Sequence, residues 1–552
     1  MNTLSKAQIL NEMAQIKLME RGKLCPYHIK NRSPQAEPYF KLQNWEHGKN
    51  RTRHVPPEQV PLVQAALAGY AQYEALSGQL VDLVIQETRQ QLDAVSAGVK
   101  KKAPTADLLL AQNEEISQLI QRFSSGSPDG SAVQQLEFLV RTAIFKPANE
   151  LVGLLFQQAV DRVDAAYQAQ PGQVRKGRVT IELQGIFGSF PVSRDYYYHA
   201  GKHRGHYPAD AALGVENGYT PALARLMCLE GADASGYPQA ENHLLETGGI
   251  AVSARQIQRV VQRVGVAAQA WQEREALPGA CDAPIMYGSA DGTGVPMRPE
   301  ELIGRPGKQE DGGAKTRQAY LGCVFTQHGR DAKGHPERDY ESTTYVSSFA
   351  SIDDFGPCLR REAIRRGMGD VPQFVLLIDG APGLENMGRL NFPGCTQIVD
   401  FYHAMEHGGQ VLEALLGSKT HPDFKKRHHL WAKELLRSRV HKLIADARQE
   451  CAGSARAEAV EKELGYFVRN VERMRYATFR RRGYFIGSGV IEAGCKTVIG
   501  ARCKKSGMFW SESGAENILA FRCINASRRL KEFWAYRLNT HAARNDSLPL
   551  AA

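Results

Sequence analysis

Between residues 374 and 380 the chain reads Phe374-Val375-Leu376-Leu377-Ile378-Asp379-Gly380. Five consecutive apolar residues that end in Asp-Gly are typical of a strand buried on both faces of a sheet. Such a strand delivers its last side chain to the carboxyl edge of the sheet, where α/β proteins form their sites. The stretch therefore predicts an α/β fold with Asp379 in a cleft, although an Asp-Gly pair alone often only closes a strand with a turn.

A second acidic residue follows another strand-like run. In Ile285–Thr293, apolar and small residues lead to Asp291, which Gly292 follows. The other elements predicted in this part of the chain are strands at 319–325, 342–346 and 396–400 and a helix at about 353–366. Each aspartate by itself is a weak indication of a site, so a third acid decides the interpretation.

The third acid is Glu492, in the stretch Ile486–Lys496. Ser488 is placed to cap a helix whose first turns carry Glu492. Cations surround this stretch, with Phe509 and Trp510 among them: Arg480, Arg481, Arg482, Lys496, Arg502, Lys504 and Lys505. Cations beside a carboxylate indicate a ligand with a phosphodiester backbone.

Two aspartates and one glutamate suit metal-assisted phosphodiester chemistry. Two Mg²⁺ ions about 4 Å apart can activate the attacking oxygen and stabilise the leaving one. Mg²⁺ requires oxygen ligands and keeps several waters, so three carboxylates and a substrate phosphate suffice. Asp291, Asp379 and Glu492 are therefore the predicted ligands of two Mg²⁺ ions, for which Mn²⁺ should substitute.

Asp400 and His403 stand three residues apart after the strand predicted at 396–400. His403 and His407 are one helical turn apart, but the HExxH pattern and a cysteine pair are both absent, which disfavours zinc. From about 408 to 476 the sequence is nearly all helical and charged, as in a helical insertion within the catalytic domain.

Composition favours an intracellular protein with several domains and a polyanionic partner. The chain has 552 residues, a net charge of +10 and a pI near 9.0. Its ten scattered cysteines indicate reduced thiols, and no apolar run approaches the roughly 20 residues that cross a bilayer. We expect no membrane association and a cytoplasmic, nucleoid-associated location. The predicted divisions are 1–103, a small basic domain; 104–280, mainly helical; 281–530, catalytic; and 531–552, a tail.

Before the catalytic domain the pattern predicts mostly helices. They are expected at 5–22, 57–99, 106–123, 133–168 and within 220–265. Hairpin strands are expected at 39–42 and 52–55, around the basic turn 47–51, and again within 177–198. After the N-cap Ser253, the residues Arg255, Arg259 and Arg263 share one helix face, which suits the recognition helix of a helix-turn-helix. A solvated face opposite an apolar stripe explains them equally well.

These motifs resemble those of DDE transposases of bacterial insertion sequences, specifically the ISKra family, which is related to Mutator-like transposases. The resemblance spans roughly 196–529. Its motifs are Ala290–Thr293, Leu376–Ala381, Asp400–His403, which matches an Asp-x-x-His signature, and Gly487–Trp510. The chain departs from the family before the catalytic domain, where Ala200 and His203 stand in a region that often carries cysteines, so a zinc module there is doubtful.

The resemblance implies an RNase H-like fold with Asp291, Asp379 and Glu492 as catalytic residues and Asp400 with His403 as a supporting pair. It also implies double-stranded DNA as partner, both transposon ends and target, and a homo-oligomer that joins two ends. Hydrolysis would expose 3′-hydroxyls, which then attack the target in line.

Other chemistries and functions stay open at this point. Tyr402 or Ser488 as a covalent nucleophile lacks a supporting base in the sequence. A stand-alone RNase H-like nuclease would share the three acids. A domesticated regulator that binds DNA without cutting it would not need them.

Overall fold

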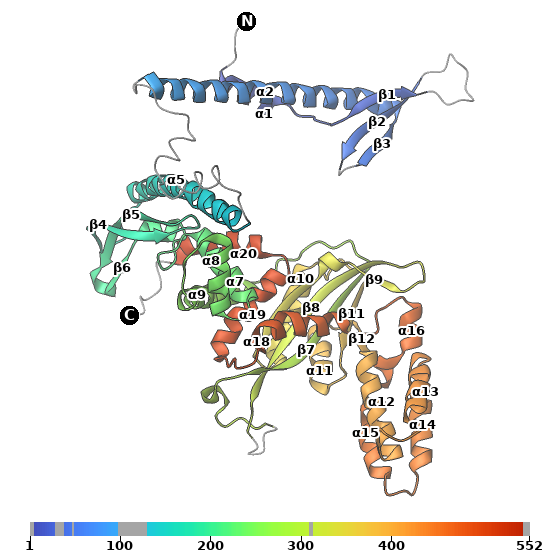
Figure 1. Cartoon of the computed structure of the whole chain (residues 1–552). Helices are drawn as coiled ribbons and strands as arrows, with labels where there is room; N and C mark the ends of the chain where they lie inside the picture. Colours follow the sequence, from blue (N-terminus) through green and yellow to red (C-terminus); the bar gives the residue numbers. More distant parts are fainter. Residues whose placement is uncertain (1–4, 28–37, 47–48, 98–129, 308–312, 545–552) are drawn as a thin grey trace. The chain divides into compact units, whose positions relative to one another are not determined.

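A mixed β-sheet of six strands forms the centre of the computed structural model (Figure 1). The structure describes residues 5–27, 38–46, 49–97, 130–307 and 313–544. The strand order is β10-β8-β7-β11-β12, with β9 paired to β8. Strands β7, β8 and β10 are antiparallel neighbours, whereas β11 runs parallel to both β7 and β12. Their bounds are β7 (Ile285–Pro296), β8 (Thr316–Arg330), β9 (Pro336–Arg338), β10 (Thr344–Ser348), β11 (Gln373–Ile378) and β12 (Thr396–Val399).

Both faces of this sheet are covered, which explains the unbroken apolar run in β11. Helices α10 (Ile352–Arg365) and α11 (Pro382–Asn391) connect β10 to β11 and β11 to β12. One face packs on these two helices, through Met286, Ala290, Leu376 and Ile378 against Phe355, Leu359 and Met387. The opposite face carries Tyr287, Val375 and Leu377 and belongs to a larger core with C-terminal helices. The predicted α/β class is confirmed in this mixed sheet.

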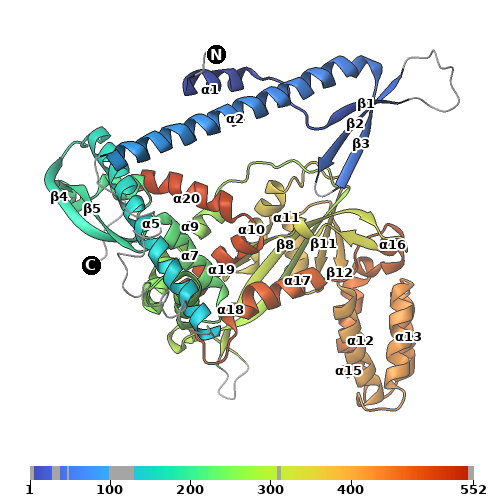
Figure 2. The same ribbon diagram turned by 45° about the horizontal axis from the view of Figure 1, so that its top comes forward.

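The helical insertion predicted at 408–476 is present and begins earlier, at Phe401. Its first four helices pack side by side, as Figures 1 and 2 show. The bounds are α12 (Phe401–Leu416), α13 (Phe424–Leu436), α14 (Val440–Cys451), α15 (Ala457–Asn470), a 3-10 turn (Val471–Met474) and α16 (Tyr476–Arg481).

The C-terminal part returns to the sheet as helices (Figure 2). The short α17 (Gly489–Gly494) contacts β7 and β8 and continues into a π-helical segment, Cys495–Gly500, and α18 (Ala501–Cys503). Helix α19 (Glu512–Ala526) packs against β10. The segment predicted as a tail contains α20 (Leu530–Arg544), which contacts α19.

Before the central sheet lie a small sheet and a group of helices. The sheet has the order β4-β5-β6 and packs under α5 through Val160, Leu183, Phe190 and Val192. Its main hairpin matches the one predicted within 177–198. The bounds are α5 (Gly130–Ala166), β4 (Gln173–Gln184), β5 (Ser189–His199), β6 (Arg204–His206), α6 (Pro208–Ala212), α7 (Pro221–Asp233), α8 (Tyr237–Gly248) and α9 (Ala254–Glu273).

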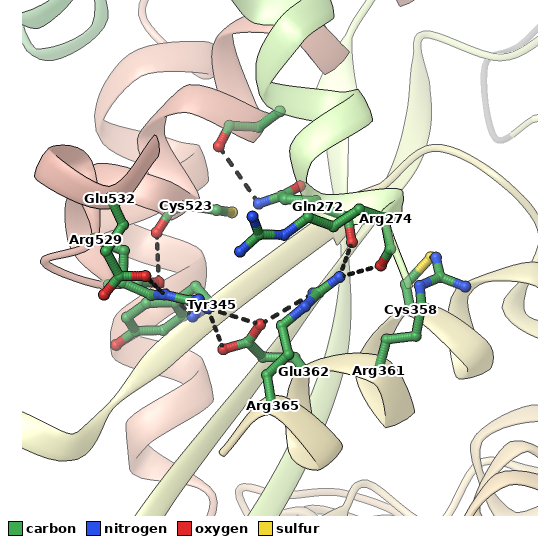
Figure 3. Close-up of polar contacts among 12 residues, drawn as sticks. Gln272, Arg274, Tyr345, Cys358, Arg361, Glu362, Arg365, Cys523, Arg529 and Glu532 are labelled. Carbon is green, nitrogen blue, oxygen red and sulfur yellow. Dashed lines mark hydrogen bonds and ion pairs between the residues drawn. The ribbon is translucent and has the colours of Figure 1, made fainter. Parts of the chain in front are cut away.

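Helix α9 is tied to the central domain by a buried ion-pair network centred on Glu362 of α10 (Figure 3). The carboxylate lies 3.4 Å from Nη1 of Arg365 and 3.3 Å from Nη1 of Arg529, and only 4 % of the Glu362 side chain is exposed. Arg365 also donates to the backbone carbonyls of Gln272 and Arg274, at 2.7 and 2.5 Å. The network therefore joins α10, the end of α9 and the segment before α20.

The chain divides into two compact units, 1–140 and 141–552. In the first unit, strands pair in the order β1-β2-β3, and α1 packs against α2. Helix α1 is shorter than predicted at 5–22, because residues 16–22 are neither helix nor strand and lead into β1, while β2 and β3 form the predicted hairpin. The helix predicted at 106–123 and residues 47–48 of the basic turn lie outside the described residues. The bounds are α1 (Lys6–Gln15), β1 (Lys23–Tyr27), β2 (Tyr39–Glu46), β3 (Lys49–Val55) and α2 (Val60–Ala97).

Within the described ranges, no helix has a stretch long and apolar enough to cross a membrane. The four-part division of the chain predicted from the sequence stays a prediction.

Candidate active site

The two predicted aspartates lie on neighbouring parallel strands. In the pairing of β7 with β11, Ser289 stands opposite Leu377. Continued by two residues, this register brings Asp291 opposite Asp379, and adjacent strands are about 4.8 Å apart. Because side chains alternate along a strand, both carboxylates point to the face that carries Tyr287 and Leu377. The sheet thus places the first two acids side by side.

The electrostatics of Asp291 reflect this neighbour. Burial raises the pKa of the Asp291 carboxyl above its usual range, and the negative charge of Asp379 raises it further. Hydrogen bonding to the Gly292 N–H and the positive charge of His403 act in the opposite direction but do not cancel the shift. A carboxylate pair of this kind is stabilised by a cation that both groups can share.

The turn after β11 is fixed by contacts to its backbone. The Asp379 carboxylate accepts the Ala381 N–H at 2.8 Å. The Tyr466 hydroxyl donates to the Asp379 carbonyl at 2.7 Å, and Asn470 Nδ2 donates to the Gly380 carbonyl at 3.2 Å. Gly380 has φ +84°, and a Cβ there would lie 2.8 Å from the Tyr466 hydroxyl, so only glycine fits this turn.

Glu492 reaches the same face from α17, which contacts β7 and β8. In the adjoining π-helical segment, the Cys495 thiol donates to the Asp291 carboxylate at 3.7 Å. Burial first, and the Asp291 charge second, raise the pKa of Cys495 to about 12, and Glu492 contributes in the same direction. Cys495 is therefore a neutral thiol between the two acids.

Ser488 precedes α17 as predicted but does not cap it through its side chain. Its backbone N–H donates to the Asp400 carboxylate instead, and its hydroxyl lies 3.5 Å from Glu492 Oε1. Ser488 therefore occupies the predicted N-cap position, but its side chain makes no capping hydrogen bond.

Asp400, which is buried, and His403, which is partly exposed, form a pair at the start of α12. Asp400 is fully buried and accepts the His403 N–H at 2.7 Å, while His403 Nδ1 lies 3.3 Å away. Burial alone would raise the Asp400 pKa, but hydrogen bonds from His403 and Ser488 outweigh it and hold the pKa below its usual range. The hydrogen bond to Asp400 raises the pKa of His403 to about 9.

The ligand atoms of Asp400, His403 and Glu492 lie within 4.8 Å of one another, which makes them a possible metal-binding group in the described part of the chain. Both oxygens of Asp400 also accept a backbone hydrogen bond, from His403 and from Ser488. His407 lies outside the group and stacks on Tyr466, with ring centroids 3.7 Å apart.

The predicted cations divide into exposed and buried ones. Lys504 donates to the Thr293 hydroxyl, two residues after Asp291, and is exposed beside the acids. Arg502 is only 1 % exposed, donates to the Gly231 carbonyl at 3.1 Å and lies over the rings of Tyr237 and Trp510. Its predicted contact with DNA does not fit this interior position. The other cations near Glu492 predicted to contact DNA are exposed: Arg480, Arg481, Arg482 and Lys505.

Helix α9 has the amphipathic arrangement that its sequence indicated. Ile257, Val260, Val261 and Val264 are buried, and the three arginines are exposed on the other side. Ser253 and Gln256 form a capping box at its start. Arg263 Nε lies 3.3 Å from the buried carboxylate of Glu216. Arg255 and Arg259 stay candidates for a DNA groove, and a solvated face stays the alternative.

Sequence reasoning missed Tyr466, Asn470 and Cys495. Tyr466 and Asn470 stand about 90 residues after the Asp379 turn that they support, at successive turns of α15. No local sequence pattern predicts a contact between residues so far apart in the chain. Cys495 lies three residues after Glu492, and this helical spacing is a signal that could have placed it near the acids.

No family model matches the chain, and no curated protein matches it. Among solved structures, the Drosophila P element transposase strand transfer complex matches with 11% sequence identity and a TM-score of 0.20. The match covers 58% of this chain and 80% of that one. A likeness of this size does not establish a shared fold.

Proposed function

We propose that this chain is a DDE transposase of a bacterial insertion sequence of the ISKra type. It would cleave DNA at the ends of the element and join the resulting 3′-hydroxyls to target DNA. The observation that carries the proposal is the pair Asp291 and Asp379 on adjacent parallel strands, with Glu492 brought to the same face by α17.

The donor set suits hard divalent cations, because carboxylate oxygens are the ligands that Mg²⁺ prefers. Asp291, Asp379 and Glu492 would hold two Mg²⁺ ions, or Mn²⁺ in their place. When bound, such ions supply Lewis-acid stabilisation of the attacking and leaving oxygens. The rest of the site is arranged to position these ligands. Tyr466 and Asn470 fix the Asp379 turn, and the buried Asp400 holds the Ser488 backbone before Glu492.

The exposed cations complete the proposed site. Lys504 stands beside Asp291, and a lysine there can neutralise a backbone phosphate next to the cleaved bond. Substrate orientation by such contacts lowers the barrier without any covalent intermediate. Tyr402 is exposed and has no base hydrogen-bonded to its hydroxyl among the described contacts, and Ser488, although its hydroxyl lies 3.5 Å from Glu492 Oε1, is buried away from a DNA substrate; both observations support the metal-dependent route.

The sheet supports an RNase H-like assignment of the catalytic domain. Numbered by appearance without the short β9, its strands have the order 3-2-1-4-5, with three antiparallel strands first and two parallel ones after. The first acid lies on the first strand, and the second follows the fourth strand. This is the arrangement expected of the RNase H-like core that the sequence motifs imply.

The test is DNA cleavage and strand transfer with a fragment that carries both ends of the element, in Mg²⁺ or Mn²⁺. We expect wild type to expose 3′-hydroxyls and join them to a target plasmid. Loss of a metal-holding carboxylate removes several kcal/mol of transition-state stabilisation, so Asp291→Asn, Asp379→Asn and Glu492→Gln should each lose roughly a thousandfold in rate. Asp446→Asn, in an exposed pair on α14, is the matched control and should cleave normally.

Three results would change the assignment. Cleavage without joining points to a stand-alone nuclease. DNA binding by a wild type that is inert with every metal points to a regulator without catalysis. Normal cleavage by the three variants would remove the acids from the site altogether. Because two DNA ends must be joined, we expect a homo-oligomer on DNA.

A further inference from the structure

A basic cavity opens beside the edge strand β12, away from the acids. Its volume is about 540 Å³. Gln397 of β12 contributes to the lining, as do α11, the end of α15 and α16. Five arginines line it: Arg389, Arg469, Arg473, Arg475 and Arg482. Only two carboxylates, Glu385 and Glu472, face them, so five positive charges against two negative ones leave a surplus of three. We call this cavity the Arg473 pocket.

Arg473 is the unusual member of this set because its charge is buried. Only 8 % of the residue is exposed. Nη2 is bound, 2.7 Å from Glu385 Oε2, and it also donates to the Asn470 side chain. Nε and Nη1 are buried and have no hydrogen-bond partner among the described residues. Buried guanidinium donors are rarely left unsatisfied, so these two leave Arg473 short of acceptors at the wall of the pocket.

Gln397 adds a second unsatisfied group to the same pocket. Its Oε1 is buried without a hydrogen-bond partner among the described residues. The oxygen and nitrogen of a side-chain amide are assigned and not seen, so a rotation of this amide presents an N–H₂ donor instead. The planar guanidinium group of arginine can donate two parallel hydrogen bonds to two oxygens of one phosphate. The pocket is therefore built for a phosphate group.

The position of the pocket indicates which phosphate of a DNA substrate it would bind. Gln397 precedes Asp400 by three residues, about 10 Å along an extended strand. That distance is about three base steps of a DNA strand. Arg473 also connects to the acids through Asn470, which it contacts and which donates to the Gly380 carbonyl in the turn after Asp379.

We propose that the Arg473 pocket binds a backbone phosphate of the DNA substrate, a few nucleotides from the bond that is cleaved. The proposal rests on the proposed function for its choice of DNA. Through Asn470, the occupied pocket holds the Asp379 turn, so Arg473 is a positioning residue as well as a phosphate ligand.

The test is the salt dependence of DNA binding by the full chain in EDTA, where cleavage plays no part. Each phosphate contact contributes a slope of about 0.9 to the plot of log affinity against log salt. We expect Arg473→Gln to reduce the magnitude of this slope by about 0.9, the contribution of one phosphate contact. We also expect it to weaken DNA binding at low salt. Arg448→Gln, in an exposed pair with Glu461 on the neighbouring helices, is the matched control and should leave the slope unchanged.

A second variant guards against misfolding, because Arg473 is also held by Glu385. The double variant Arg389→Gln/Arg469→Gln removes two exposed arginines of the same pocket and should lower the slope in the same direction. An unchanged slope in Arg473→Gln and in the double variant would overturn the proposal. A second result would also overturn it. If inorganic phosphate stabilises wild type but not Arg473→Gln against heat, and the DNA slope is the same in both proteins, then the pocket binds free phosphate and not DNA.

The outcome separates this proposal from the proposed function. A lower slope in a protein that never cleaves DNA would support the pocket and count against the transposase. Normal cleavage with an unchanged slope would support the transposase and overturn the pocket.

Discussion

Two aspartates of one sheet, on or after strands that β11 separates, have opposite surroundings. Asp400, after β12, is fully buried and accepts hydrogen bonds from His403 and from the Ser488 backbone, which hold its pKa below the usual range. Asp291, on β7, is partly exposed and faces Asp379, and burial together with that charge raises its pKa. A carboxylate that accepts hydrogen bonds from two segments stabilises the fold, whereas one beside another carboxylate is stabilised by a cation. On the proposed function, this difference would separate a structural acid, Asp400, from a metal-binding one, Asp291.

The largest effect that we predict is on stability, at Asp400. Asp400→Asn leaves the charged His403 without its partner and turns an N–H₂ toward donors. Breaking a fully buried ion pair costs about 3–5 kcal/mol; because His403 is partly exposed, we expect a cost below this range that still lowers the urea midpoint of the chain. Asp446→Asn, whose partner Lys442 is on the surface, should hardly change it. Equal midpoints for Asp400→Asn and wild type would mean that Asp400 does not anchor this site.

The His403 pair also predicts a dependence on pH. The pKa of His403 in the folded chain is raised to about 9, above the ordinary histidine value of 6.5. Its contribution to stability is therefore complete below about pH 6.5 and is lost as the pH rises through about 9. We expect the unfolding free energy, measured in EDTA, to decline over this window in wild type and to decline less in His403→Gln. Parallel profiles for the two proteins would contradict the pairing.

A smaller effect of opposite sign is expected at Asp291. In the absence of metal, Asp291→Asn relieves repulsion from Asp379, so the unfolding free energy should stay constant or rise by about 1 kcal/mol or less. The measurement is a urea titration in EDTA. Strong destabilisation by this variant would place Asp291 with Asp400 among the structural acids and would remove the contrast between them.

The smallest effect concerns the arginines of α9. If α9 reads a groove, Arg255→Gln and Arg259→Gln should each lower the salt slope of DNA binding by up to about 0.9 and reduce preference for the end sequence. Arg263 is held by Glu216 and should matter less. Filter binding with end and unrelated DNA measures both quantities. Variants that match wild type on both DNAs would assign this face to solvent.

Local patterns predicted what lies within one element. The run at 374–378 predicted the buried strand β11, and the spacing in 254–264 predicted the two faces of α9. The aspartate at the end of β11 could be proposed for a cleft because a sheet edge collects such side chains. These inferences needed only the periodicity of strands and helices.

Contacts between distant segments could not be predicted. Asp400 and Ser488 are 88 residues apart, and Tyr466 reaches Asp379 across 87. The charge of Arg502 suggested a surface position in the sequence. Its burial depends on contacts with Tyr237, Gly231 and Trp510, which come from other segments and could not be predicted. Likewise, the N-cap position of Ser488 was predicted, but its backbone hydrogen bond to the distant Asp400 was not.

The most direct test of the central claim is Mn²⁺ binding by calorimetry, without DNA, in wild type, Asp291→Asn, Asp379→Asn and His403→Gln. We predict that wild type binds Mn²⁺, that both aspartate variants lose most of this binding, and that His403→Gln retains it. Binding that persists in both aspartate variants and disappears in His403→Gln would contradict the account, because the metal would then lie at Asp400, His403 and Glu492.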